Sequence, residues 1–117
     1  MSIVADIVLL CDLSEAFTED FETLEHPPAV ASLNAWLEEH EWAPLVPLGQ
    51  AMSTEAAFQA CAYGGAIVRL DVPAFLRAVA AQSWAKRDAV LLALKNEGEE
   101  RFTVYRLGSD GAIAAIG

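Results

Sequence analysis

Residues 57–84 constrain the fold most, because a strand pattern there runs directly into a helix pattern. The first part, 58–70, is apolar and rich in glycine and β-branched residues, which predicts a buried strand with a bulge at Gly64 and Gly65. Asp71 is a favourable N-cap, and Pro73 falls in the first helical turn. The apolar residues that follow have helical spacing: Val72, Phe75, Leu76, Val79 and Ala80. Strand and helix therefore form one unit, and one face of the helix must be buried.

A second strand is predicted over residues 3–11, which are almost all apolar. Such a run is typical of a central strand that is covered on both faces. Asp6 shares a face with Val4 and Val8, so it is either buried with a partner or marks where that face opens. Arg69 is the candidate partner, and a structural ion pair is the expected role.

The chain has 117 residues, 55% of them apolar, which predicts a single domain over 1–117 with a sizeable core. The N-terminal apolar run contains Asp6 and has no basic residues before it, so we interpret it as a strand rather than a signal peptide or a membrane span. Cys11 and Cys61 lie in predicted strands without CxxC spacing. This pattern predicts two buried, unreactive thiols in a reducing, cytoplasmic setting.

The remaining segments supply a helix and shorter strands. A helix is predicted over 28–40, with Val30, Leu33 and Leu37 facing inward and with Trp36 and His40 at the edge of that stripe. Residues 45–48 contain a proline and predict an edge strand. A hairpin is predicted from 89–95 to 101–107 around a glycine turn, and 112–116 returns as a last strand.

This order of elements predicts an α+β fold. It matches the ferredoxin-like, split βαβ plan, in which two helices cover one face of an antiparallel sheet, with an extra C-terminal β-hairpin. An architecture carries no functional residues by itself, so function must be argued from the side chains.

Charge is distributed unevenly along the chain. The net charge is −10, and residues 1–68 hold eleven acids but no lysine or arginine. A surface of this kind disfavours nucleic acids and anionic membranes as partners and favours a basic protein. The alternative is that the acidic residues only keep an apolar domain soluble.

Two segments concentrate the acids. Residues 12–25 combine six acids with apolar residues at near-helical spacing, which predicts an acidic amphipathic turn or a short helix. Such a helix would start at Glu15, with Ser14 as its N-cap. Glu38, Glu39 and Glu41 lie at the end of the helix over 28–40, where the helix dipole disfavours negative charge. We expect the two segments to form one contiguous acidic surface.

The sequence contains few signs of catalysis. There is no phosphate-binding glycine motif, no cofactor motif, and no close ligand spacing among the histidines and cysteines. A thiol nucleophile would need Cys11 or Cys61 beside His26 or His40, and nothing in the local sequence pairs them. The sequence therefore favours a protein that is not an enzyme and that holds no metal.

Two functional hypotheses follow. The first is an acidic binding module, such as an immunity protein or inhibitor that neutralises a basic nuclease toxin. The second is a ferredoxin-like domain that forms a homodimer through its sheet and binds or converts a small molecule. Under the first hypothesis the partner-binding residues are Asp12, Glu15, Glu19, Asp20, Glu22, Trp36, Glu38, Glu39, Glu41 and Trp42.

Overall fold

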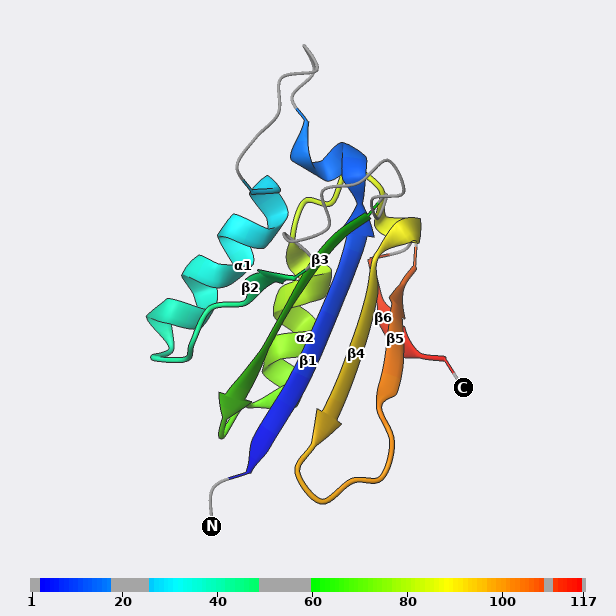
Figure 1. Ribbon diagram of the computed structural model, residues 1–117. Helices are drawn as coiled ribbons and strands as arrows, with labels where there is room; N and C mark the ends of the chain where they lie inside the picture. The colour runs from blue at the N-terminus through cyan, green and yellow to red at the C-terminus, as the bar shows by residue number, and fades with distance from the viewer. Residues whose placement is uncertain (1–2, 18–25, 49–59, 109–110, 117) are drawn as a thin grey trace.

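The computed structural model describes residues 3–17, 26–48, 60–108 and 111–116. These residues form an α+β structure with two α-helices and a six-stranded antiparallel sheet (Figure 1). The elements are β1 (Val4–Asp12), the 3-10 helix η1 (Leu13–Ala16), α1 (Pro28–Glu39), β2 (Val46–Leu48), β3 (Ala60–Val68), α2 (Val72–Ala81), the 3-10 helix η2 (Arg87–Ala89), β4 (Leu91–Asn96), β5 (Thr103–Leu107) and β6 (Ile113–Ala115).

The strands are arranged in the order β2-β3-β1-β4-β5-β6, and each neighbouring pair is antiparallel. The connection from β1 to β2 contains α1 and skips over β3, whereas the connection from β3 to β4 contains α2 and skips over β1. The last three strands are sequential neighbours, so β5 and β6 extend the sheet beyond β4.

One face of the sheet carries the core. Alternate residues of β1 are buried there, and Leu9 is fully buried. The predicted inward stripes of both helices join the same apolar cluster, which confirms them, and α2 lies behind β1 and β3 in the view of Figure 1. The fully buried helix residues are Val30, Leu33, Leu37, Phe75 and Val79.

The predicted bulge at Gly64 and Gly65 is wrong. The pairing of β3 with β1 runs without interruption, with Gly64 opposite Val8 and Gly65 opposite Ile7. Gly64 is needed because the backbone of β1 and an edge-strand side chain approach it closely. A Cβ at this position would lie 2.8 Å from the Ile7 carbonyl oxygen and 2.8 Å from Cδ1 of Leu48.

The expected ion pair between Asp6 and Arg69 is also wrong. Asp6 is exposed and lies opposite Ala66 on β3 and Lys95 on β4. Arg69 lies beyond the end of β3, where a φ of 58° turns the chain towards α2, and its backbone N–H donates to the Ile3 carbonyl at 2.8 Å. Of the two possibilities for Asp6, the structure therefore supports the one in which its face of the sheet opens.

The prediction that both faces of β1 are covered is wrong, because only alternate residues of this strand are buried. Several other local predictions are confirmed. The Asp71 carboxylate accepts from the N–H of Ala74 at 3.1 Å and caps α2, and β2 lies at the edge of the sheet. Gly98 adopts a φ of 93° in the turn of the predicted hairpin. The start of η1 differs from the prediction, because Asp12 rather than Ser14 caps it.

Candidate functional site

The end of α1 is a tight turn that places a glutamate in an unfavourable conformation. The Leu37 carbonyl accepts from the N–H of Trp42 at 2.9 Å, and the Glu38 carbonyl accepts from the N–H of Glu41 at 3.0 Å. Glu41 has a φ of 63°, a left-handed conformation in which glycine is the usual residue at a helix end. For a residue with a Cβ this conformation costs about 1 kcal/mol.

The side chain of Asn34 holds the segment that follows the turn. Its amide nitrogen donates to the Leu45 carbonyl at 3.0 Å, and its oxygen accepts from the Leu45 N–H at 2.9 Å. This pair of bonds satisfies both backbone groups of Leu45 just before β2. The chain from the end of α1 to the edge strand is thereby fixed at both ends.

Three aromatic rings pack together at this turn. The ring centroid of Trp36 lies 4.5 Å from that of His40 and 5.6 Å from that of Trp42, and the rings of His40 and Trp42 are stacked with an interplanar angle of 11°. Nδ1 of His40 donates to the Trp36 carbonyl at 2.8 Å, which fixes the orientation of the imidazole. Trp36 also approaches the core residue Phe75, with 6.5 Å between the ring centroids.

The carboxylates around these rings are exposed. Glu38, Glu39 and Glu41 are all open to solvent, whereas both tryptophans are half-buried. We call this set the aromatic–acidic cap, made up of Trp36, Glu38, Glu39, His40, Glu41 and Trp42. It combines a preorganised ring cluster with negative charge at a helix end whose dipole disfavours it.

The structure assigns Glu15 a different role from the expected one. It is only 4% exposed, so it does not belong to an acidic surface. Its two carboxylate oxygens accept hydrogen bonds from the backbone N–H groups of Ala85 and Lys86, each at 2.8 Å. Glu15 therefore ties η1 to the segment that follows α2.

Asp12 also has internal partners. It accepts from the Ser14 N–H at 2.9 Å and lies 3.8 Å from Nζ of Lys86. Hydrogen bonds from the side chain and the backbone of Ser14 lower the pKa of this carboxyl below its usual value. Glu19, Asp20 and Glu22 lie outside the described residues.

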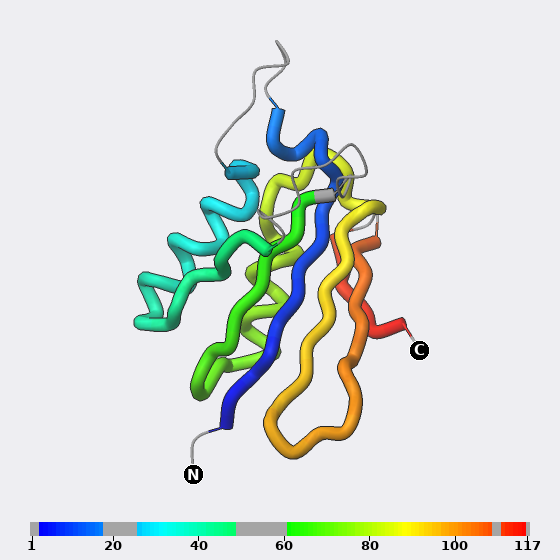
Figure 2. Tube along the Cα trace, in the orientation of Figure 1, coloured from blue at the N-terminus to red at the C-terminus, as the bar shows by residue number. Residues whose placement is uncertain are grey.

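The described acids do not form one contiguous surface. β1 ends at Asp12. Figure 2 shows that this end of β1 lies on the side where α1 starts, whereas the aromatic–acidic cap follows from the other end of that helix. A helix of 12 residues is about 18 Å long. Asp12 and Glu15 therefore do not share a surface with the cap, and the other acids of the predicted patch in 12–25 lie outside the described residues.

A second group of chemically interesting side chains lies on β1 and β3. Cys11 and Cys61 occupy directly opposite positions on these strands, and Cys11 is buried whereas Cys61 is half-buried. Burial, together with the neighbouring Cys61, raises the pKa of the Cys11 thiol from 9.0 to about 12, and burial also raises the pKa of Cys61. Both thiols are therefore protonated at neutral pH, which is the opposite of an activated nucleophile.

His26 and Tyr63 add a contact that the sequence did not reveal. Nδ1 of His26 lies 3.0 Å from the Tyr63 hydroxyl, and burial raises the pKa of Tyr63 to about 12. A tyrosine in this state is neutral and serves as a hydrogen-bonding group. Within the described ranges, no group of three or more His, Cys, Asp or Glu side chains is placed to hold a metal ion.

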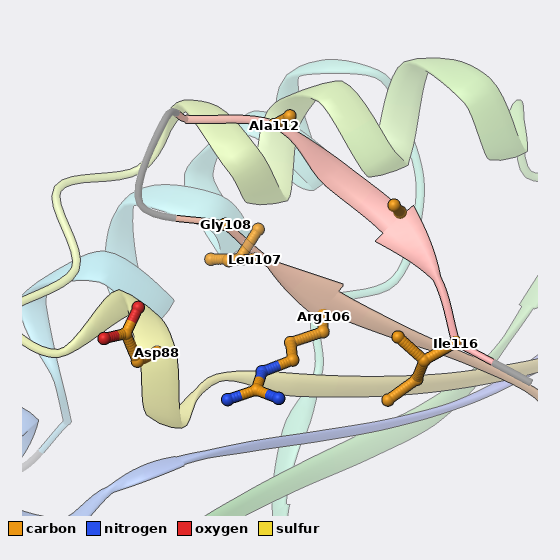
Figure 3. Close-up of a pocket in the computed structure, with 7 residues that line it drawn as sticks. Asp88, Arg106, Leu107, Gly108, Ala112 and Ile116 are labelled. Carbon is orange, nitrogen blue, oxygen red and sulfur yellow. The ribbon is translucent and has the colours of Figure 1, made fainter.

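An open groove of about 510 Å³ lies between η2 and the β5–β6 hairpin (Figure 3). Asp88 and Arg106 contribute one acid and one base to it, and the rest of the lining is apolar or glycine.

No helix in the described part of the chain is long and apolar enough to cross a membrane.

Comparisons of the chain with protein-family models, with curated proteins and with solved structures found no match.

Proposed function

We propose that this protein is a non-enzymatic binding module that engages a basic protein partner through the aromatic–acidic cap. The observation that carries the proposal is the cluster of Trp36, His40 and Trp42, whose rings pack together among three exposed carboxylates. No lysine or arginine precedes Arg69 in the sequence, so neighbouring residues in the chain supply no compensating base.

The composition of the cap suits such an interface. Tryptophan is enriched among the residues that dominate binding energy, and packing in the free protein reduces the entropy lost on binding. Carboxylates at the rim increase the association rate with a positively charged partner. The strained backbone of Glu41 adds support, because unfavourable conformations tend to persist where a side chain is used.

The concrete form of this proposal is an immunity protein or inhibitor that neutralises a cationic protein, for example a nuclease toxin. An acidic inhibitor can compete with nucleic acid for the basic surface of such an enzyme. We further propose a cytoplasmic location, where the opposed thiols Cys11 and Cys61 stay reduced.

We also propose that the fold is ferredoxin-like. The support is the order β2-β3-β1-β4 together with two crossover connections, each containing one α-helix. Both connections skip one strand, as the split βαβ plan requires. In this plan β5 and β6 form the added C-terminal hairpin.

The test is binding to the product of the adjacent gene, because an immunity gene lies beside the gene for its toxin. The complex should form in a pull-down with purified proteins, and association rates should then be measured at low and high salt. Steering between opposite charges is screened beyond about 8 Å at physiological ionic strength, so the association rate should fall steeply with salt.

Two variants probe the cap itself. Trp42→Ala should mainly increase the dissociation rate, whereas Glu38→Lys combined with Glu41→Lys should mainly reduce the association rate. Glu97→Lys combined with Glu100→Lys, at two exposed sites in the turn between β4 and β5, is the control with the same change in net charge. Binding that is insensitive to salt and to both cap variants would show that the acidic residues serve only solubility.

A further inference from the structure

The second face of the sheet is apolar at its centre. The strand register places Val8 at its centre, flanked by Gly64 on β3 and Ala93 on β4. The same row continues to Val46 on β2 and Val104 on β5. Five strands therefore present apolar side chains or glycine in one unbroken row.

The next row repeats this pattern. Leu10 lies between Ala62 and Leu91, and the row ends at Leu48 on one side and at Arg106 and Ala114 on the other. An antiparallel sheet with one face in water normally carries polar residues on that face. A row of leucine and valine in these positions indicates a surface that becomes covered.

The described elements leave side chains exposed at the edge and at one end of this face, and Val8 at its centre is half-buried. Val46, Val68 and Leu48 are 52%, 48% and 43% exposed, and all three lie on it by register. Both α-helices contribute to the core on the other face, and α2 lies behind the sheet in Figure 1. Contiguous apolar patches of several hundred Å² are typical of interaction sites.

We propose that a second copy of this chain covers this face, giving a homodimer in which two sheets pack against each other. The inference does not depend on the aromatic–acidic cap, which is built by α1 and the turn after it. A negative result for the homodimer would therefore not contradict partner binding through the aromatic–acidic cap, and the reverse also holds.

The charge distribution favours a second copy. Two chains with a net charge of −10 repel each other, and this repulsion is weakest when they meet through a surface without net charge. The register places two acids, Asp6 and Asp12, and two bases, Lys95 and Arg106, on this face, so its described residues carry no net charge. The charges lie outside the central row, and the acid Asp6 lies opposite the base Lys95, a favourable cross-strand arrangement.

The dimensions and the shape are also suitable. The six strands differ in length, from three residues in β2 and β6 to nine in β1 and β3, and at the usual rise and strand spacing they give a face of roughly 550 Å². Two such faces together cover roughly 1,100 Å², just above the area of about 1,000 Å² that a specific interface needs. Two such faces pack about 10 Å apart with nearly aligned strands, and a two-fold axis lets each copy use the same residues.

The proposal is tested by sedimentation velocity of the full chain over a dilution series. The wild-type protein should sediment with the mass of two chains. Val8→Lys should raise the dimer dissociation constant by roughly 100-fold or more, because a lysine would be buried between two apolar faces. Lysine makes the chain less negative, so loss of the dimer could not be attributed to added repulsion.

If Val8→Lys fails to fold, the homodimer is tested with a double variant, Val46→Lys with Val68→Lys. Val46 and Val68 are both exposed in the single chain, so lysine there should not disturb folding. It should retain the circular dichroism spectrum and become monomeric. Ala31→Lys, on the exposed side of α1, is the matched control and should remain dimeric. A wild-type monomer at all concentrations would overturn the proposal, as would a dimer that the double variant leaves intact.

Discussion

The Glu15 carboxylate accepts a hydrogen bond at 2.8 Å from the backbone N–H of Lys86, which lies 71 residues further along the chain. The other carboxylate oxygen accepts from the preceding N–H of Ala85 at the same distance. A single side chain thereby fixes η1 against the segment between α2 and β4. Because the carboxylate is buried, this contact belongs to the stability of the fold and not to partner binding.

We predict that Glu15→Ala lowers the free energy of unfolding by about 2 to 3 kcal/mol, because two backbone donors lose a charged acceptor. Glu15→Gln keeps one carbonyl oxygen and should lose roughly half as much. Chemical denaturation measures both, with Glu97→Ala at an exposed position as the control. A loss below about 0.5 kcal/mol for Glu15→Ala would mean that water replaces the carboxylate without penalty.

Phe75 offers a test of the core. It is fully buried at the centre of the α2 stripe, so Phe75→Ala should lower the free energy of unfolding by about 3 to 5 kcal/mol. Arg77→Ala, on the exposed side of the same helix, should change it by less than about 0.5 kcal/mol. A loss under about 1 kcal/mol for Phe75→Ala would contradict the packing of α2 against the sheet.

The thiol of Cys11 predicts a loss of stability at alkaline pH. Its pKa is about 12 in the folded protein against 9.0 as the ordinary value, so above pH 9 the unfolded chain binds fewer protons than the folded one. Stability therefore falls as pH rises, by about 1.3 kcal/mol between pH 8 and pH 10. Below pH 10 the raised pKa of Tyr63 contributes little, because its ordinary value is 10.0, whereas burial raises the pKa of Cys61 from 9.0 and adds to the loss.

Denaturation of wild type and Cys11→Ala at several pH values between 8 and 10 tests this prediction. The variant should have a lower free energy of unfolding at pH 8 but a flatter dependence on pH. In the same range, Cys11 should resist thiol labelling in the native protein, and Cys61 should react before it because it is only half-buried. Parallel pH curves for the two proteins would show that Cys11 titrates normally in the fold.

Local sequence signals were sufficient for the helices. The Asp71 cap and the apolar stripes of both helices could be recognised because they depend on residues within a few turns of each other. The hairpin between β4 and β5 was predicted for the same reason, since Gly98 supplies the turn conformation.

Long-range geometry explains what could not be predicted. The opposition of Cys11 and Cys61 depends on the register between β1 and β3, which no local pattern specifies. The partners of Glu15 lie 70 and 71 residues away, so its acidic neighbours in sequence suggested a surface position. Gly64 was interpreted as a bulge because the approach of Leu48 from another strand is invisible in the sequence.

Substitutions of Glu41 can separate the effect of this residue on the stability of the fold from its proposed role in partner binding. Glu41→Gly removes the Cβ that disfavours a φ of 63° and should raise the free energy of unfolding by up to about 1 kcal/mol. Glu41→Gln keeps the strain and removes only the charge. If the carboxylate steers a basic partner, both variants should slow association to a similar extent, although only the glycine variant is more stable. Denaturation and association rates at low salt together distinguish the two effects. A glycine variant that is less stable than wild type would show that the Glu41 side chain itself supports the end of α1.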